Sequence, residues 1–329
     1  MPANPGLTPD QILGELADLW VTLGKRGEAE TGMGVLRACS LSLVVLAEES
    51  DDFQALGETL AALMPEHPAR TFVIRLRPGA GLTGRVFAQC WMPFGQRRQI
   101  CCEQVEVTAS ESTLGDAIDV VAAATASDLP VVAWCRSARL LEQAAFHKFA
   151  RFAARVVVDS AAFPDPKAAI GSLAQLAAQD VLLADLSWTR LTRWRDVLSR
   201  TLENRDCRTR LPARIQVAIA FGGETPSVSA RYMAAWLSGS LRTAGANVSV
   251  SLQSDPSALP GQLGGVELTG EELRIELKRT DGCLRVVVNG LSQPTGLPPA
   301  SDYLLMREEL GILQRDPIFE RTLVSAKNL

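Results

Sequence analysis

Histidine is scarce in this sequence, which holds only His67 and His147 among its 329 residues. The two lie far apart along the chain and in different kinds of segment, a proline-containing loop and a predicted helix. Catalysis by a serine or cysteine nucleophile commonly relies on a neighbouring histidine as the general base. The sequence therefore gives no support to a catalytic site of this type.

Long apolar runs and an excess of basic residues are also missing. No stretch approaches the roughly 20 apolar residues that span a bilayer, and residues 1–5 (MPANP) resemble no export signal. The formal net charge is −4 and the pI is about 5.4, whereas nucleic-acid binding needs a concentrated basic surface. We therefore expect a cytoplasmic protein that binds neither membranes nor nucleic acid.

The glycine-rich motifs that bind nucleotides are missing where they would function. A dinucleotide-binding fold places G-x-G-x-x-G directly after its first strand, but here the first predicted strand is followed by residues 47–52 (AEESDD). Four carboxylates would repel a pyrophosphate, and the pair Gly32 and Gly34 precedes the strand. No Walker A sequence or complete set of metal ligands is present either. We therefore expect no catalytic centre, bound cofactor or metal.

Seven cysteines lie at positions 39, 90, 101, 102, 135, 207 and 283, with no CxxC pair among them. An odd number, without an export signal, favours reduced thiols over a disulfide framework. Cys101 and Cys102 are adjacent in a predicted strand, so their side chains point to opposite faces and a vicinal disulfide would strain the backbone. Arg97 and Arg98 are close enough in sequence to lower the pKa of one thiol. A redox role for Cys101 or Cys102 stays open beside a simpler role as buried apolar residues.

Strand and helix patterns alternate along the first part of the chain. Strands are predicted over 37–46, 71–76, 84–91, 100–107, 130–135 and 155–159, and helices over 10–23, 52–63, 113–126, 138–150, 166–178 and 189–203. Residues 24–34 read as a polar linker. Such alternation is typical of a mostly parallel sheet with helices on both faces. The fold class is therefore α/β.

A polar stretch over 203–210, followed by Pro212, marks the expected domain boundary. It separates an α/β domain over 1–210 from a smaller α+β domain over 211–329. The second domain is predicted to contain strands over 214–220, 247–252, 271–278 and 284–288, a helix over 227–244 and two C-terminal helices. Asp281-Gly282 is a strong hairpin signal between the last two strands, and residues 255–265 read as a connection rich in proline and glycine.

A glycine pair, Gly222 and Gly223, lies between a predicted strand and the helix that follows. Backbone N–H groups at such a turn can bind an anion at a helix N-terminus. This keeps open a sugar-phosphate-binding enzyme or sensor. A tight turn with Ser227 as the N-cap explains the same residues, and no lysine or arginine lies within the turn.

Tryptophan and arginine, which dominate protein-binding hot spots, gather in two segments. The first carries Trp91, Phe94, Arg97 and Arg98 in a loop between two predicted strands. Large apolar side chains beside two arginines, without a catalytic base, are more typical of a protein interface than of an active site. This loop is therefore a candidate contact surface for a partner protein.

The second segment carries Trp188, Arg190, Arg193 and Trp194 at a predicted helix start. Residues three or four positions apart share one face of a helix, so these side chains would form one surface, with Ser187 as a possible cap. Tryptophans packed on the sheet with solvated arginines explain the pattern equally well. We predict that at least one of the two segments contacts the partner.

Ordered blocks over roughly residues 35–200 resemble the glucose-6-phosphate dehydrogenase assembly protein family (OpcA). The blocks are 37–41 (RACSL), 67–70 (HPAR), 90–95 (CWMPFG), 99–104 (QICCEQ), 128–131 (DLPV), 134–137 (WCRS), 158–160 (VDS) and 188–195 (WTRLTRWR). Beyond residue 211 only 232–237 (YMAAWL) carries a looser likeness. The number and order of the blocks make the resemblance specific.

The resemblance implies a protein with no enzymatic activity of its own that binds glucose-6-phosphate dehydrogenase and promotes its oligomerisation and activation in the oxidative pentose phosphate pathway. NADP and glucose 6-phosphate would then bind the partner and not this chain. Cysteines of photosynthetic members of the family are implicated in thioredoxin-linked control, so thioredoxin is a further expected partner. The alternatives are the sugar-phosphate-binding enzyme or sensor at Gly222-Gly223 and a thiol redox relay.

Overall fold

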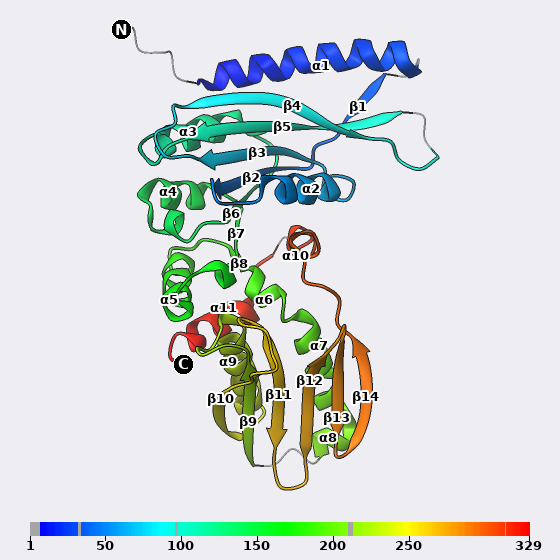
Figure 1. Cartoon of the computed structure of the whole chain (residues 1–329), viewed down its shortest axis with the longest axis vertical. Helices are drawn as coiled ribbons and strands as arrows, with labels where there is room; N and C mark the ends of the chain where they lie inside the picture. The colour runs from blue at the N-terminus through cyan, green and yellow to red at the C-terminus, as the bar shows by residue number, and fades with distance from the viewer. Residues whose placement is uncertain (1–6, 32–33, 96–97, 210–212, 313) are drawn as a thin grey trace. The chain divides into compact units, whose positions relative to one another are not determined.

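The computed structural model describes residues 7–31, 34–95, 98–209, 213–312 and 314–329, and the chain forms two compact units (Figure 1). The first unit consists of Met1–Val158, Gln179–Ala184 and Glu309–Gly311; the second consists of Asp159–Ala178, Asp185–Glu308 and Ile312–Leu329. The predicted boundary near residue 210 thus lies inside the second unit. The difference arises because helices before residue 210 pack on helices that follow it, as described below.

One eight-stranded sheet forms the centre of the first unit. Its strands are β1 (Val35–Arg37), β2 (Leu41–Glu48), β3 (Ala69–Leu76), β4 (Thr83–Trp91), β5 (Gln99–Ala109), β6 (Val131–Cys135), β7 (Arg155–Val158) and β8 (Leu183–Asp185). Their order is β1-β5-β3-β2-β6-β7-β8, and β4 pairs antiparallel with β5. The path β5-β3-β2-β6-β7-β8 has the strand order of a doubly wound nucleotide-binding fold, with its switch point between β2 and β6.

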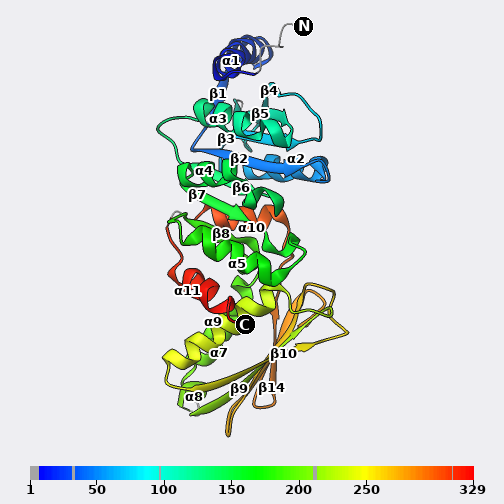
Figure 2. The same cartoon turned by 90° about the vertical axis from the view of Figure 1, so that its left-hand side faces the viewer.

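Helices cover both faces of this sheet, as the sequence predicts. They include α2 (Phe53–Leu63), α3 (Leu114–Ala124) and α4 (Ala144–Phe152). Figure 2 shows α2 on one side of the sheet and α3 and α4 on the other, which is the arrangement that right-handed crossovers produce on the two sides of a switch point. All residues of β6 and β7 are buried, because neither face of these strands is open to water.

The first helix, α1 (Pro9–Thr31), is longer than predicted and takes up most of the expected linker. Figures 1 and 2 both place it beyond β4, along the edge of the sheet. Trp20 of α1 donates its indole N–H to the buried carboxylate of Glu103. Glu103 also pairs with Arg70 (2.5 Å) and Arg37 (2.8 Å). One carboxylate on β5 thus connects α1, β1 and β3.

The second unit contains a mixed six-stranded sheet in the order β10-β9-β11-β12-β13-β14. The strands are β9 (Arg214–Phe221), β10 (Asn247–Ser254), β11 (Leu263–Thr269), β12 (Arg274–Thr280), β13 (Cys283–Val288) and β14 (Leu291–Gly296). Strands β9 and β10 are parallel, and the other neighbours are antiparallel. The hairpin at Asp281-Gly282 is confirmed, whereas β11 and β14 were not predicted.

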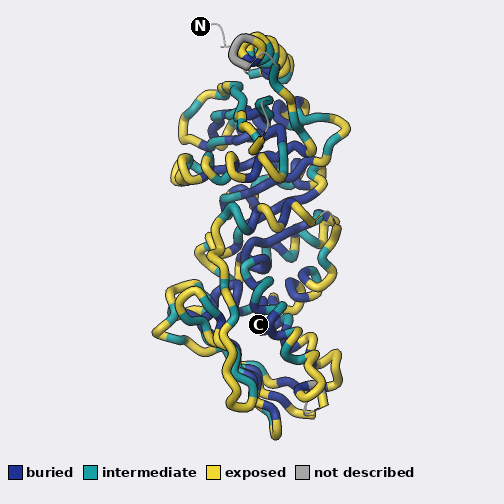
Figure 3. Tube along the Cα trace, turned by 90° about the vertical axis from the view of Figure 1, so that its right-hand side faces the viewer, coloured by how far each residue is buried: buried dark blue, intermediate teal, exposed yellow. Residues whose placement is uncertain are grey.

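The helices of the second part of the chain are α5 (Pro166–Ala177), α6 (Leu186–Thr189), α7 (Thr192–Glu203), α8 (Arg205–Thr209), α9 (Val228–Thr243), α10 (Asp302–Leu310) and α11 (Pro317–Ala326). Helix α9 packs on β9 and β10, and α5 and α6 pack on α9. This packing unites residues 166–189 with the C-terminal sheet. In each unit the buried residues follow the strands and the inner sides of the helices (Figure 3).

Within the described part of the chain, no helix combines the length and apolar character needed to cross a bilayer. The same residues contain no group of three or more metal-ligating side chains close enough to hold an ion.

Candidate functional sites

The carboxyl ends of β2 and β6 form the switch point, where doubly wound folds bind nucleotides. Glu48, the last residue of β2, accepts hydrogen bonds from the hydroxyl of Ser137 and from Arg139 (Nη2–Oε2, 2.6 Å). The bond from Arg139 lowers the pKa of Glu48 below its usual value. Asp51 pairs in the same region with Arg136 (2.8 Å). Side-chain ion pairs thus occupy the place where a pyrophosphate would need N–H donors, and the two carboxylates would repel it.

The loop after β4 exposes large apolar side chains. Phe94 is fully exposed, Met92 is half exposed, and Trp91 is half-buried at the end of β4. Arg98 is half-buried where the chain enters β5, and Arg97 lies outside the described residues. The loop therefore retains the apolar part of the predicted contact surface, with Phe94 as its most accessible member.

The strands that flank this loop are joined by a disulfide between Cys90 and Cys101. The two cysteines lie directly opposite each other in the antiparallel β4–β5 pair. The expectation that the cysteines are reduced is therefore wrong for Cys90 and Cys101. The sequence contained the necessary signal, because two predicted strands joined by a short loop bring residues 90 and 101 into register.

Cys102 is the other residue for which a redox role was considered. It is 1% exposed, and its thiol donates to the carbonyl oxygen of Ala38 (3.3 Å). Burial raises the pKa of Cys102 to about 11. Since the thiolate is the reactive form, Cys102 is an inert core thiol, and the proximity of Arg98 in the sequence does not activate it.

The second predicted contact segment splits into buried tryptophans and paired arginines. Trp188 is 3% exposed and Trp194 is 0% exposed. The ring of Trp188 contacts Tyr232 and Phe319. Its indole N–H donates to the carboxylate of Asp316 (Nε1–Oδ2, 2.9 Å). Of the two explanations of this segment, packing in the core holds for Trp188 and Trp194, and a place on a contact surface does not, because both complete the core of the second unit.

Asp185, at the end of β8, is the buried anchor of this segment. It caps α6 by accepting from the backbone N–H of Ser187 (2.9 Å), so the cap is Asp185 and not Ser187. It also accepts from Ser160, through both N–H and hydroxyl, and from the hydroxyl of Tyr232 (2.8 Å). Burial raises the pKa of Asp185 to about 6. No motif in the sequence marks Asp185 as a functional or structural residue.

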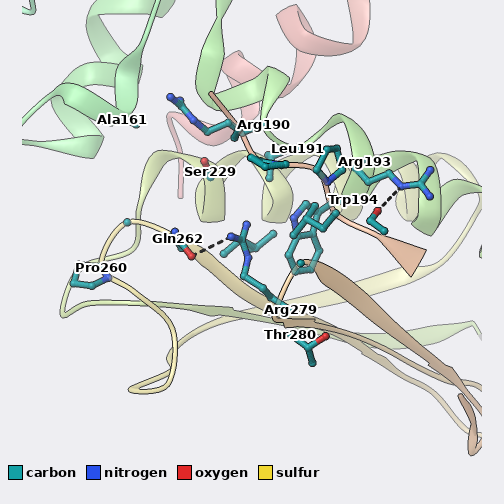
Figure 4. A pocket seen from close by; sticks show the side chains of 18 residues that line it. Ala161, Arg190, Leu191, Arg193, Trp194, Ser229, Pro260, Gln262, Arg279 and Thr280 are labelled. Carbon is teal, nitrogen blue, oxygen red and sulfur yellow. Dashed lines mark hydrogen bonds between the residues drawn. The ribbon is translucent and has the colours of Figure 1, made fainter. Parts of the chain in front are cut away.

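Arg190 and Arg193 line a cavity of about 1200 Å³ in the second unit. Arg190 forms a two-pronged pair with Asp159 (both 2.6 Å), and Arg193 pairs with Asp196 (2.8 Å). A third arginine, Arg279 of β12, also lines the cavity (Figure 4). Sequence reasoning missed Arg279, because nothing in a strand pattern distinguishes an arginine that faces a cavity from one that faces water.

The glycine turn at Gly222-Gly223 is closed by a neighbouring segment. The N–H of Gly222 donates to the carbonyl of Gln262 (2.9 Å), and the N–H of Gly261 donates to the carbonyl of Gly222 (3.1 Å). A Cβ on Gly222 would lie 2.1 Å from the carbonyl oxygen of Leu259, so this close approach requires glycine. Ser227 caps α9, as predicted. The N–H of Gly222 is thus unavailable to an anion.

Two family models match the sequence. The model of the glucose-6-phosphate dehydrogenase subunit N-terminal domain matches residues 61–175, and that of the C-terminal domain matches residues 181–323. Together they cover most of the chain. The division between the two matches also lies well before residue 210.

Curated relatives include two cyanobacterial proteins named OpcA after the OxPP cycle. The protein of Synechococcus elongatus is 25% identical over 281 residues, which cover 74% of this chain and 63% of the relative. That of Synechocystis is 26% identical over 181 residues, which cover 52% of this chain and 37% of the relative. The chain thus matches less than two thirds of the length of these relatives.

Solved structures with a similar fold include a 3-ketoreductase of Actinomadura kijaniata in complex with NADP. It is 12% identical, the match covers 87% of this chain and 95% of that chain, and the TM-score is 0.47.

Proposed function

Since the chain belongs to the glucose-6-phosphate dehydrogenase subunit family, we propose that it is a non-catalytic accessory protein that binds glucose-6-phosphate dehydrogenase. Binding promotes assembly and activation of the enzyme in the oxidative pentose phosphate pathway. In this proposal the chain is cytoplasmic and acts as an allosteric activator. It binds one oligomeric or conformational state of the enzyme more tightly than the others, and therefore raises the population of that state.

The observation that carries the non-catalytic part of the proposal is the ionic network at the switch point. Glu48, held ionised by Arg139, lies at the end of β2 where a nucleotide-binding fold presents backbone N–H groups. An enzyme that transfers hydride to NADP needs that position for the pyrophosphate. The chain therefore has the scaffold of a dinucleotide-binding unit but carries carboxylates, paired with arginines, at the binding position.

The β4–β5 loop is the part of the first unit that we propose to contact the dehydrogenase. Phe94 and Met92 expose apolar area next to the half-buried Trp91, and an aromatic anchor beside arginine is the composition of an interface hot spot. The disulfide between Cys90 and Cys101 holds the two ends of the loop together. A loop with fixed ends loses less conformational freedom on binding.

The test mixes the purified chain with the cognate dehydrogenase and follows co-elution on size exclusion and the rate of NADP reduction. The chain alone should reduce no NADP, and its addition should raise dehydrogenase activity. Phe94→Ala should weaken binding by about thirtyfold, because truncating a hot-spot side chain costs ~2 kcal/mol of binding free energy. It should leave the melting temperature unchanged, because the side chain is exposed. Phe152→Ala, at another exposed phenylalanine of the first unit, is the matched control.

Two outcomes would contradict the proposal at different levels. If the chain neither co-elutes with the dehydrogenase nor changes its activity, the accessory function is wrong. If binding is normal but equal for the parent and Phe94→Ala, the function stands and the loop is not the contact surface.

Thioredoxin remains part of the proposal through Cys90, the exposed member of the disulfide. A thioredoxin thiolate would attack the Cys90 sulfur and release Cys101 as a thiolate; the second thioredoxin thiol would then displace Cys90, leaving thioredoxin oxidised and this chain reduced. Activation of the dehydrogenase should then differ between reduced and oxidised parent but not respond to reduction in Cys90→Ser/Cys101→Ser. Equal activation by oxidised and reduced parent would remove thioredoxin from the proposal.

A further inference from the structure

The cavity of about 1200 Å³ in the second unit has an unusual lining. Its described lining residues include three arginines and neither aspartate nor glutamate. Two of the arginines pair with carboxylates that do not line the cavity: Arg190 pairs with Asp159, and Arg193 pairs with Asp196, which also pairs with Arg200. The third, Arg279, forms no ion pair with any carboxylate in the part of the chain that the structure describes. The lining thus carries at least one positive charge, that of Arg279, which no carboxylate among the described residues pairs with.

The guanidinium of Arg279 uses little of its hydrogen-bonding capacity. Nη1 donates to the side-chain oxygen of Gln262 (3.0 Å), while Nε is buried and has no partner among the described residues. A guanidinium carries five N–H donors, and the Nε and Nη2 edge forms the planar fork that binds a carboxylate or phosphate through two bonds. In Figure 4 this side chain rises from the strand toward the segment that carries Arg190 and Arg193.

Burial of this charge is unfavourable for the chain alone. Arg279 is half-buried, and burial without a compensating carboxylate lowers its pKa. A partly desolvated charge with no counter-charge destabilises a fold, whereas an anion in the cavity would supply both the missing charge and the missing acceptors. The same side chain that is unfavourable in the empty cavity would therefore be favourable in the occupied one.

We propose that this cavity binds a small organic molecule that carries a phosphate group, with Arg279 as its charged anchor. A phosphate monoester carries between one and two negative charges near neutral pH, which matches an uncompensated arginine with two further arginines in the same wall. Leu191, Leu263 and Pro298 supply apolar lining for the organic part, and Thr280 and Ser229 supply hydroxyls. The volume of about 1200 Å³ exceeds the roughly 300–1,000 Å³ of ordinary ligand pockets, which leaves room for more than inorganic phosphate.

The proposal needs no dehydrogenase, so its test uses the full chain alone and fails or succeeds independently of the accessory function. Calorimetry and thermal unfolding are recorded with inorganic phosphate, glucose 6-phosphate, citrate and glucose as probes. We expect saturable binding and a raised melting temperature with glucose 6-phosphate, weaker effects with inorganic phosphate, and none with glucose. Citrate binding as tightly as glucose 6-phosphate would overturn the assignment to phosphate, and no saturable binding of either phosphate probe would overturn the site.

Variants of Arg279 distinguish binding from a structural role. Arg279→Gln should weaken glucose 6-phosphate binding by about tenfold or more, and without ligand its melting temperature should equal or exceed that of the parent, since an unpaired charge has been removed. Arg285→Gln, at an exposed arginine of the neighbouring strand β13, is the matched control and should bind like the parent. Arg279→Lys keeps the positive charge but removes the guanidinium edge of Nε and Nη2. It therefore tests the two hydrogen bonds to the phosphate without a change in net charge. Unchanged affinity in both Arg279 variants would refute the proposal.

Discussion

Asp185 offers a quantitative test of how the second unit holds its buried charge. The carboxyl group is 0% exposed and accepts hydrogen bonds from the N–H groups of Ser160 (3.1 Å) and Ser187 (2.9 Å). Its other oxygen contacts the hydroxyls of Ser160 and Tyr232. Burial nevertheless outweighs these bonds and raises the pKa from 3.8, the ordinary value for aspartate, to about 6. Compared with the unfolded chain, the fold therefore favours the protonated form of Asp185.

The sign of the pH dependence follows from this shift. In the unfolded chain Asp185 ionises with the ordinary pKa of 3.8, and in the folded chain it ionises only near pH 6. Between these values the unfolded state binds fewer protons, so the free energy of unfolding falls as pH rises. A difference of about 2 between the two pKa values changes the free energy of unfolding by ~3 kcal/mol. The stabilising contribution is fully present below about pH 4 and is lost above about pH 6.

The perturbation is Asp185→Asn, which removes the charge and keeps the shape. The amide oxygen can accept from the two N–H groups, and the amide NH₂ can donate to the hydroxyls of Ser160 and Tyr232. Near neutral pH the variant should be as stable as the parent or more stable, by up to ~3 kcal/mol. Urea unfolding at several values between about pH 4 and about pH 7 should show a flatter profile for the variant than for the parent.

Asp185→Ala is the contrasting variant. It leaves buried donors without an acceptor, at about 1–3 kcal/mol for each unsatisfied group, and should be strongly destabilised at every pH. Two results together would contradict this prediction. In the first, Asp185→Asn lowers the free energy of unfolding by about 2 kcal/mol or more near neutral pH. In the second, the free energy of unfolding of the parent rises relative to that of the variant between about pH 4 and about pH 6. These results would mean that Asp185 is ionised and stabilised by its hydrogen bonds.

Three further predictions concern groups whose burial decides their role. Glu103→Ala leaves the buried Arg70 without its carboxylate and should cost about 3–5 kcal/mol in urea unfolding; a loss below about 1 kcal/mol would show that the pair is solvated. Cys102 should resist iodoacetamide in the folded chain and react after unfolding, as mass spectrometry can measure, because burial raises its pKa to about 11; rapid labelling of the native chain would contradict this. Trp194→Ala should cost about 3–5 kcal/mol of stability, whereas a surface tryptophan would cost little.

The sequence predicts most of the first sheet, because fully apolar runs such as 131–135 match strands that are buried on both faces. It misses β14 (Leu291–Gly296), where polar residues and Pro294 occupy an exposed edge strand, since no burial pattern marks such a strand. The length of α1 was underestimated because Gly24 and Gly27 suggested a linker. Gly27 lies against Val35, where a Cβ would come within 2.7 Å of its side chain, so tertiary packing overrides its low helix propensity.

For the candidate sites, the sequence shows which side chains lie on one element but not what surrounds them. Arg190 and Arg193 of the segment 188–195, which the sequence places in a contact surface, line a cavity; their contact with a partner stays a prediction. Spacing on a helix shows which side chains share a face but not whether that face is covered, which is why Trp188 and Trp194 were placed on a surface. Arg279 belongs to a different element, and only the tertiary structure brings it to the same cavity.

The position of α1 along β4 determines how the first unit can recognise another protein. An uncovered edge strand would offer a row of free backbone N–H and C=O groups to which a partner could add a strand. Helix α1 lies along one edge of this sheet, and the strand at the other edge, β8, has only three residues. Backbone pairing, which is tolerant of sequence, is therefore disfavoured at these two edges. Recognition at this unit depends on side chains, which makes it selective for partners with a matching surface.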